Sequence, residues 1–92
     1  MHTIPQYYNI SSIYPNPFNP ITRINYGIPE YSKVEVIVYN LTGKEVKSLI
    51  NEFQMPGYYQ IVWNAASYPS GMYFVTLIAG DFLKTQKLML VK

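Results

Sequence analysis

The sequence predicts an all-β fold, an antiparallel sandwich of about seven short strands, and three observations support this prediction. Apolar and polar residues alternate with a period of two along several short runs, which is typical of strands buried on one side. Seven Pro and five Gly divide the 92 residues into runs that are mostly too short for a helix. Aromatic residues make up 16% of the chain and include ten Tyr, a residue that favours pleated, half-buried surfaces.

The alternating runs place apolar side chains on one face of four expected strands. These inward-facing residues are Ile24, Tyr26 and Ile28 in 22–28, Val34, Val36 and Val38 in 33–39, Tyr59, Ile61 and Trp63 in 58–63, and Tyr73, Val75 and Leu77 in 72–78. A last strand is expected over residues 82–92. Short strands at this spacing favour an immunoglobulin-like sandwich, in which Trp63 would lie in the core between the sheets.

Turn residues connect the expected strands. Residues 40–43, Asn-Leu-Thr-Gly, are expected to form a tight turn with Gly43 in a left-handed conformation. Residues 56–57, Pro-Gly, fit the centre of a type II turn. Residues 80–81, Gly-Asp, fit a two-residue hairpin loop.

Residues 44–54 allow two interpretations. Apolar residues at helical spacing would line one face of an amphipathic helix, and these are Val46, Leu49, Ile50 and Phe53. The turns on either side instead match a β-meander. A strand is therefore the favoured prediction for this segment.

Composition limits the classes of function. The length suits a single domain. Hydrophobic residues make up 49% and charged residues 13% of the chain, the reverse of the balance in disordered chains. The net charge is +2 and the seven Lys and Arg are scattered, which argues against nucleic-acid binding through a dense basic stripe. The chain has no cysteine, so stability has to come from the core and the strand ladders.

No constellation of catalytic residues stands out. Nothing in the spacing pairs the five carboxylates, which are Glu30, Glu35, Glu45, Glu52 and Asp81. His2 is the only histidine, and a Ser nucleophile would need a His base. No glycine-rich phosphate loop and no cluster of zinc ligands occurs. We therefore expect no enzymatic activity and no cofactor, with a calcium site of scattered oxygens as the one metal alternative.

The aromatic surplus allows a second interpretation. Sugar-binding sandwiches expose Trp and Tyr rings that stack on pyranose rings. Core packing and strand propensity also explain the surplus, and they are favoured because Trp63 is predicted inside. Six tyrosines are candidates for exposed contacts: Tyr7, Tyr8, Tyr14, Tyr31, Tyr58 and Tyr68.

Residues 14–20 form the most distinctive segment, Tyr-Pro-Asn-Pro-Phe-Asn-Pro. Its three prolines lack backbone donors and restrict φ, and each preceding residue is driven to extended geometry. The two Asn can cap neighbouring backbone groups. These residues alone predict a stiff loop that places Phe18 over one end of the core.

This segment resembles the opening of the C-terminal sorting domain of the type IX (Por) secretion system, in its type A form. The likeness continues in order through residues 22–26 and 38–46, Gly57, Trp63-Asn64, residues 70–74 and residues 84–92. Asn40 stands where the family more often has Asp. The motif positions are Pro15, Asn16, Pro17, Phe18, Asn19, Pro20, Gly43, Gly71 and Tyr73.

The resemblance implies a role in protein export. Residues 14–92 would be the C-terminal sorting domain, and residues 1–13 would be a linker to an upstream cargo domain. The precursor would reach the periplasm of a Bacteroidetes-like bacterium by a separate N-terminal signal, and the outer-membrane translocon would recognise the domain. In many family members a sortase-like peptidase then removes the domain, and the cargo is secreted or attached to the cell surface.

The terminal strand is the candidate recognition element, through Lys87, Leu88, Leu90, Val91 and Lys92. An unpaired sheet edge beside the free carboxylate would allow capture by strand addition, and exposed edges would also support a weak homodimer. In the alternative interpretation, the apolar residues of this set simply pack into the core. Both interpretations can hold, because one face packs while the edge is recognised.

Two alternatives keep the fold and change the function. The domain is also similar to the immunoglobulin-like domain of the flagellar hook-capping protein, a structural element with a similar Asn-Pro-Phe-Asn-Pro opening and Ser-Gly-x-Tyr strand. A cell-surface adhesion or sugar-binding module rests on the aromatic residues alone. The ending at Lys92 favours sorting, because a basic residue after an apolar last strand is typical of the sorting family.

Overall fold

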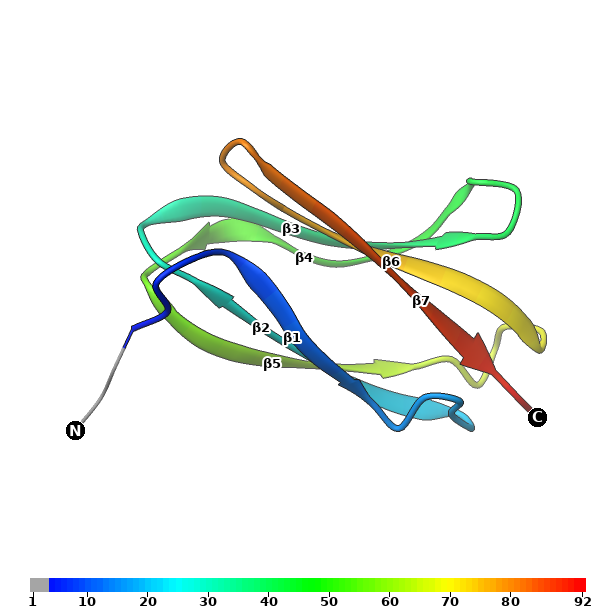
Figure 1. Ribbon diagram of the computed structural model, residues 1–92. Coiled ribbons are helices and arrows are strands. Elements are labelled where there is room, and N and C mark those ends of the chain that lie inside the picture. The colour runs from blue at the N-terminus through cyan, green and yellow to red at the C-terminus, as the bar shows by residue number, and fades with distance from the viewer. Residues whose placement is uncertain (1–3) are drawn as a thin grey trace.

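The computed structural model describes residues 4–92 as two packed antiparallel sheets (Figure 1). The strands are β1 (Asn9–Tyr14), β2 (Ile21–Ile28), β3 (Ser32–Asn40), β4 (Glu45–Gln54), β5 (Gly57–Asn64), β6 (Gly71–Ala79) and β7 (Phe82–Leu90). One sheet has the order β1-β2-β5, and the other has the order β4-β3-β6-β7. The predicted all-β, immunoglobulin-like sandwich is therefore confirmed.

The facing sides of the two sheets form one apolar core. Every predicted inward-facing residue of β2, β3 and β6 is buried, and so is Trp63 of β5. Tyr59 and Ile61 of β5 are half-buried and pack against this core. The alternation in the sequence was sufficient here because successive side chains of a strand point to opposite faces.

Local turn chemistry is confirmed at two hairpins. Asn40 Oδ1 accepts hydrogen bonds from the backbone N–H groups of Thr42 (3.1 Å) and Lys44 (3.0 Å), and Gly43 has a φ of 85°. The loop at residues 80–81 joins β6 to β7, whose register pairs Ala79 with Phe82. The favoured strand for residues 44–54 is confirmed over residues 45–54, because β4 pairs along its length with β3.

The predicted meander through residues 56–57 is wrong. β4 and β5 lie in different sheets, so residues 55–56 carry the chain across the core instead of making a hairpin. Gly57 has a φ of 157°, whereas a type II turn needs about +80°. A Pro-Gly pair marks a change of direction, but it does not determine whether the next strand pairs or crosses.

The folded part begins earlier than predicted. Ile10 and Pro5 are buried, and β1 pairs with β2 from Asn9 onward, so residues 5–13 belong to the sandwich and not to a free linker. A bulge between Ile10 and Ser12 interrupts the alternation of β1, which hid this strand from the sequence pattern. His2 and the start of the predicted linker lie outside the described residues.

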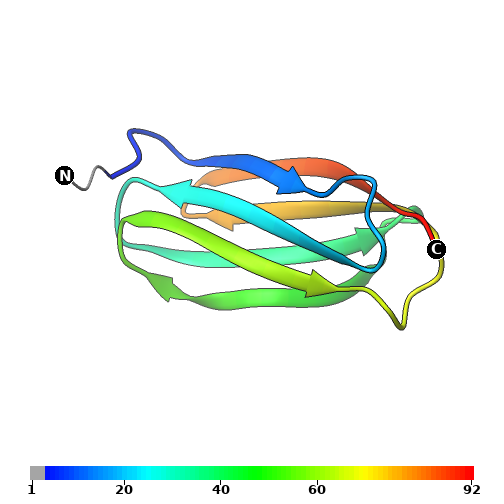
Figure 2. The same cartoon turned by 90° about the horizontal axis from the view of Figure 1, so that it is seen from below.

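The two ends of the described chain lie at opposite ends of a sandwich that measures 39 × 27 × 17 Å (Figure 1 and Figure 2). The loops that follow β1, β3 and β5 lie at the same end as the last residues. We call this end, which comprises residues 15–21, 41–44, 65–70 and 87–92, the C-terminal end. The loops that follow β2, β4 and β6 lie at the opposite, N-terminal end.

A buried hydrogen bond joins the two sheets. Tyr26 of β2 donates its hydroxyl proton to Gln54 Oε1 of β4 at 2.5 Å, and its ring stacks on Tyr59 with centroids 5.4 Å apart. Burial raises the pKa of Tyr26 to about 12, because the phenolate would lose its hydration. Burial also raises the pKa of Tyr73.

We expect the free energy of unfolding to fall as the pH rises from 10 towards 12. Unfolded Tyr26 ionises near its ordinary pKa of 10, whereas folded Tyr26 stays protonated up to about 12, so rising pH favours the unfolded state. The expected loss from this residue is roughly 1 kcal/mol at about pH 11. Urea unfolding at mildly and strongly alkaline pH measures it. In Tyr26→Phe the free energy of unfolding should fall less steeply with pH. An equally steep fall would contradict the assignment of this pH dependence to Tyr26.

Trp63 is the centre of an aromatic cluster, and its replacement tests the core. Its ring centroid lies 5.5 Å from that of Phe18, 5.6 Å from Tyr68 and 5.4 Å from Tyr73. We expect Trp63→Ala to lower the free energy of unfolding by about 3–5 kcal/mol. Trp63→Phe should cost less, because the buried Nε1 has no hydrogen-bond partner among the described residues. An unchanged thermal midpoint for Trp63→Ala would count against this role.

Candidate functional site at the C-terminal end

The predicted recognition residues separate into two groups. Leu88 and Leu90 are buried in the core, whereas Lys87, Val91 and Lys92 are exposed. Within β7 the separation follows from the strand geometry, because alternate residues face the core and the solvent. Val91 and Lys92 are exposed beyond the end of the strand. Only the exposed three are available to a partner while the domain stays folded.

The loop at residues 15–20, which we call the motif loop, covers the outer edge of β7 at the end of the strand. The Phe18 N–H donates to Met89 O (2.9 Å), and the Val91 N–H donates to Phe18 O (2.9 Å). Phe18 pairs with Leu90 as a parallel bridge. The prediction of an unpaired edge is therefore wrong at the end of β7, because the motif loop occupies it.

Asn16 extends this short ladder with its side chain. Its Nδ2 donates to Lys87 O (3.2 Å), and its Oδ1 accepts from the Met89 N–H (3.0 Å). A carboxamide carries the same donor and acceptor as a peptide group, and the next residue, Pro17, has no N–H to offer. Asn16 was predicted to cap its neighbours; it instead binds a strand more than 70 residues away.

Core packing and two further hydrogen bonds also stabilise the motif loop. Phe18 is buried against Trp63, as the sequence predicted. Pro15 O accepts a hydrogen bond from Thr22 Oγ1 (2.7 Å), and Pro20 O accepts one from the Ala65 N–H (2.8 Å). A proline has a backbone C=O that can accept a hydrogen bond and no backbone N–H that would need a partner. This suits a loop that connects two strands of one sheet and packs against the edge of the other sheet.

The last residue is bonded to the loop between β5 and β6. The Lys92 N–H donates to Ser70 Oγ (3.0 Å), and Lys92 Nζ donates to Ala66 O (2.6 Å). Ser70 and Ala66 were not among the predicted site residues, and nothing in their local sequence indicates this contact. The bonds orient the end of the chain on the surface.

The remaining motif residues are structural. Gly43 closes the hairpin after β3, and Gly71 begins β6. Tyr73 is buried, and its hydroxyl donates to Pro69 O (2.6 Å) four residues earlier. A Tyr near the start of this strand that bonds back to the chain resembles the tyrosine corner of immunoglobulin-like sandwiches.

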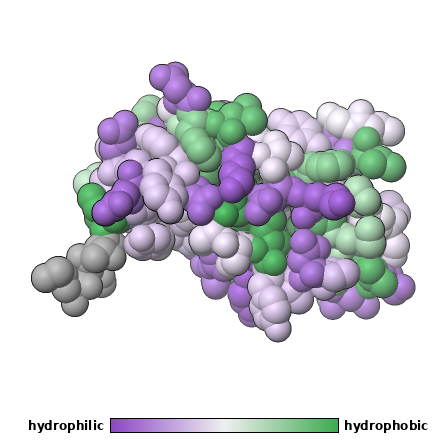
Figure 3. Space-filling model, viewed as in Figure 1, coloured by the Kyte–Doolittle hydropathy of each residue, from purple (hydrophilic) through white to green (hydrophobic). Residues whose placement is uncertain are grey.

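The exposed surface at this end is apolar and cationic. Figure 3 shows apolar residues at the end of the molecule where the chain terminates. The exposed apolar side chains there are Ile21, Leu41, Met89 and Val91. Lys87 and Lys92 stand beside the last two. The combination suits a partner surface that carries carboxylates next to apolar groups.

Among the six candidate tyrosines, four are exposed and two are packed. The exposed ones are Tyr7, Tyr14, Tyr31 and Tyr58. Tyr8 and Tyr68 pack against the core. Within residues 4–92, no three His, Cys, Asp or Glu side chains lie close enough to hold a metal ion. No helix in this described part is long and apolar enough to cross a membrane.

The fold and this site together define a small immunoglobulin-like module whose last strand and chain end are bonded into one end of the sandwich. The family model described as the secretion system C-terminal sorting domain matches residues 12–92. The chain therefore belongs to this family, the C-terminal sorting domains of type IX secretion. No curated protein and no solved structure matches the chain.

The family defines the general function. The domain is a C-terminal sorting signal for type IX secretion, which implies a preceding cargo domain and contact with the secretion machinery. Export by this route leads to the cell surface or the medium. The predicted resemblance is confirmed, over nearly the same residues as the motifs indicated.

Replacement of Asn16 tests the hydrogen bonds between the motif loop and β7. Asn16→Ala removes two hydrogen bonds to β7 and should lower the free energy of unfolding by about 1–2 kcal/mol. It should also speed hydrogen exchange of the Met89 amide, measured by NMR. Asn19→Ala, at an exposed position of the same loop, is the control and should leave that amide protected. Unchanged exchange at Met89 in Asn16→Ala would refute the ladder.

Proposed function

We propose that the outer-membrane translocon recognises the C-terminal end of the folded sandwich, and that Lys87, Val91 and Lys92 contact it. The observation that carries this proposal is the ladder between residues 16–18 and β7. It holds the end of β7 in one position and leaves these three side chains exposed. Val91 keeps 49% of its surface exposed although its backbone is bonded.

The position of this end supports the proposal. The first described residues, upstream of which a cargo domain would join, lie at the opposite end of the sandwich (Figure 2). A cargo domain attached there would leave the C-terminal end accessible. The translocon would therefore recognise the same surface whatever protein precedes the domain.

Recognition would use side chains and shape more than an open strand edge. Strand addition along residues 87–91 would first have to displace the motif loop, including the buried Phe18. Leu88 and Leu90 contribute by fixing β7 against the core. The proposal therefore assigns contact to the exposed residues and positioning to the buried ones.

Processing would take place upstream of the sandwich. We propose that a sortase-like peptidase cuts before Pro5 once the precursor has passed from the periplasm through the translocon, and that the cargo is then released or anchored at the cell surface. Pro5 is buried, and Tyr8 stacks on Phe82 with centroids 5.3 Å apart. A peptidase needs an extended, accessible segment, so these docked residues are poor substrates. The proposed role of the domain is non-catalytic.

Charge reversal at the C-terminal end tests the proposal in a type IX-competent bacterium. Residues 3–92 are fused behind a fluorescent reporter with a signal peptide, and export is measured as reporter outside the cell relative to the periplasm. We expect the intact fusion to be exported and the double variant Lys87→Glu, Lys92→Glu to remain in the periplasm. Lys47→Glu, on the opposite edge strand, is the control and should be exported.

The export results distinguish the location of the recognition surface from the sufficiency of residues 3–92 as a signal. Full export of the folded double variant would place recognition elsewhere on the domain. Retention of the intact fusion, although it is folded, would reject residues 3–92 as a sufficient signal. Circular dichroism of the purified variants establishes that each is folded. Substitution is preferred to deletion of residues 90–92, because deletion would remove the buried Leu90.

A further inference from the structure

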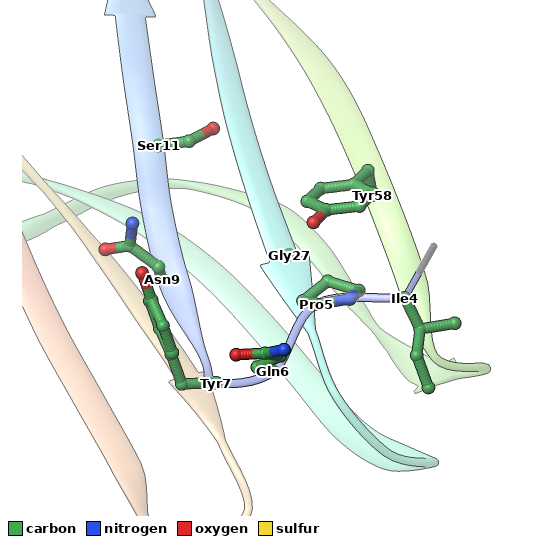
Figure 4. A pocket seen from close by; sticks show the side chains of 8 residues that line it. All are labelled: Ile4, Pro5, Gln6, Tyr7, Asn9, Ser11, Gly27 and Tyr58. Carbon is green, nitrogen blue, oxygen red and sulfur yellow. The ribbon is translucent and has the colours of Figure 1, made fainter. Parts of the chain in front are cut away.

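A groove crosses the outer face of the β1-β2-β5 sheet, away from the C-terminal end. Its larger part is a cavity of about 470 Å³ lined by Pro5, Gln6, Tyr7, Asn9 and Tyr58, among others (Figure 4). A neighbouring cavity of about 380 Å³ shares Ser11 and Tyr58 with it. The two cavities therefore form one elongated groove with Tyr58 between them.

Gly27 makes the floor of the groove possible. A Cβ at this position would lie 2.7 Å from Pro5 Cγ and 3.2 Å from Tyr58 Cδ1. Any larger residue would push the proline and the tyrosine ring away from β2. The missing side chain thus lets the N-terminal segment and Tyr58 close on the sheet from two sides.

The aromatic walls of the groove are not explained by core packing. Tyr58 is 64% exposed and Tyr7 is 68% exposed, while the neighbouring Tyr59 supplies the inward packing of β5. An exposed tyrosine ring offers a flat apolar face with partial negative charge. The C–H groups on one face of a pyranose ring are complementary to such a surface.

The polar lining is neutral and rich in amides and hydroxyls. Gln60 Nε2 donates to Asn25 Oδ1 (3.0 Å), and Asn25 Nδ2 donates to Ser12 Oγ (3.0 Å). Lys84 Nζ donates to Asn9 Oδ1 (3.0 Å), which leaves the Asn9 NH₂ group directed away from the lysine. None of the described residues that line either cavity is charged. Such groups both donate and accept, as sugar hydroxyls require.

We propose that this groove binds a neutral oligosaccharide, with one pyranose ring stacked on Tyr58 and the chain extending over both cavities. An extended peptide fits less well, because the strands under the groove already pair with each other, as in Asn25 with Gln60 and Gly27 with Tyr58. The proposal is independent of the sorting function, since the groove shares no residue with the C-terminal end.

The experiment titrates the isotope-labelled 92-residue chain with neutral hexasaccharides of β-1,4-glucose, β-1,3-glucose and α-1,6-mannose. A hexamer of galacturonic acid and a proline-rich peptide serve as comparisons. We expect at least one neutral hexasaccharide to shift the NMR signals of the Ser11, Gly27 and Gln60 amides. Tyr58→Ala should weaken that binding roughly tenfold or more, because the stacking face is lost. Tyr31→Ala, at a similarly exposed tyrosine outside the groove, should bind as the native chain does.

Three results would overturn the proposal: no shift with any neutral hexasaccharide, equal loss of binding in the two tyrosine variants, or binding of only the acidic sugar or the peptide. Thermal unfolding of both variants establishes that they are folded. Export of a Tyr58→Ala fusion is measured in parallel. Normal export with lost sugar binding would support a groove separate from the sorting signal, and loss of export in this folded variant would refute that independence.

Discussion

The structure depends on the pairing between the motif loop and the last strand. Phe18 contributes its backbone and its buried ring, and Asn16 contributes a side chain that acts as a peptide group. This pairing covers the outer edge of β7 at its end, which would otherwise be open to other strands. It also holds the end of the chain against the loop between β1 and β2, so these two segments form one surface at the C-terminal end.

The residues that mark the family are therefore mainly architectural. Gly43 and Tyr73 shape a turn and a strand corner, and Phe18 fills the core beside Trp63. In the proposed recognition, the side chains that contact the translocon are Lys87, Val91 and Lys92, which are exposed near the chain end.

Two of the errors of sequence interpretation share one origin. Residues 55–56 were expected to make a hairpin but cross between the sheets, and residues 5–13 were expected to be a linker but include β1. In both places the local residues are compatible with more than one partner. Gly27 decides the second case, because only an absent side chain lets Pro5 dock there.

The sequence alone predicts strands β2 to β7, most of their inward faces, the core position of Trp63 and the hairpin turns at residues 40–43 and 80–81. These features depend on side-chain alternation and on backbone preferences within a few residues. Three other features depend on the tertiary structure: Asn16 binds β7, Lys92 contacts the loop after β5, and Tyr58 lies in a groove. Those contacts join residues far apart in the chain. Their polar groups could form hydrogen bonds with many partners, and the fold determines which partner lies within hydrogen-bonding distance.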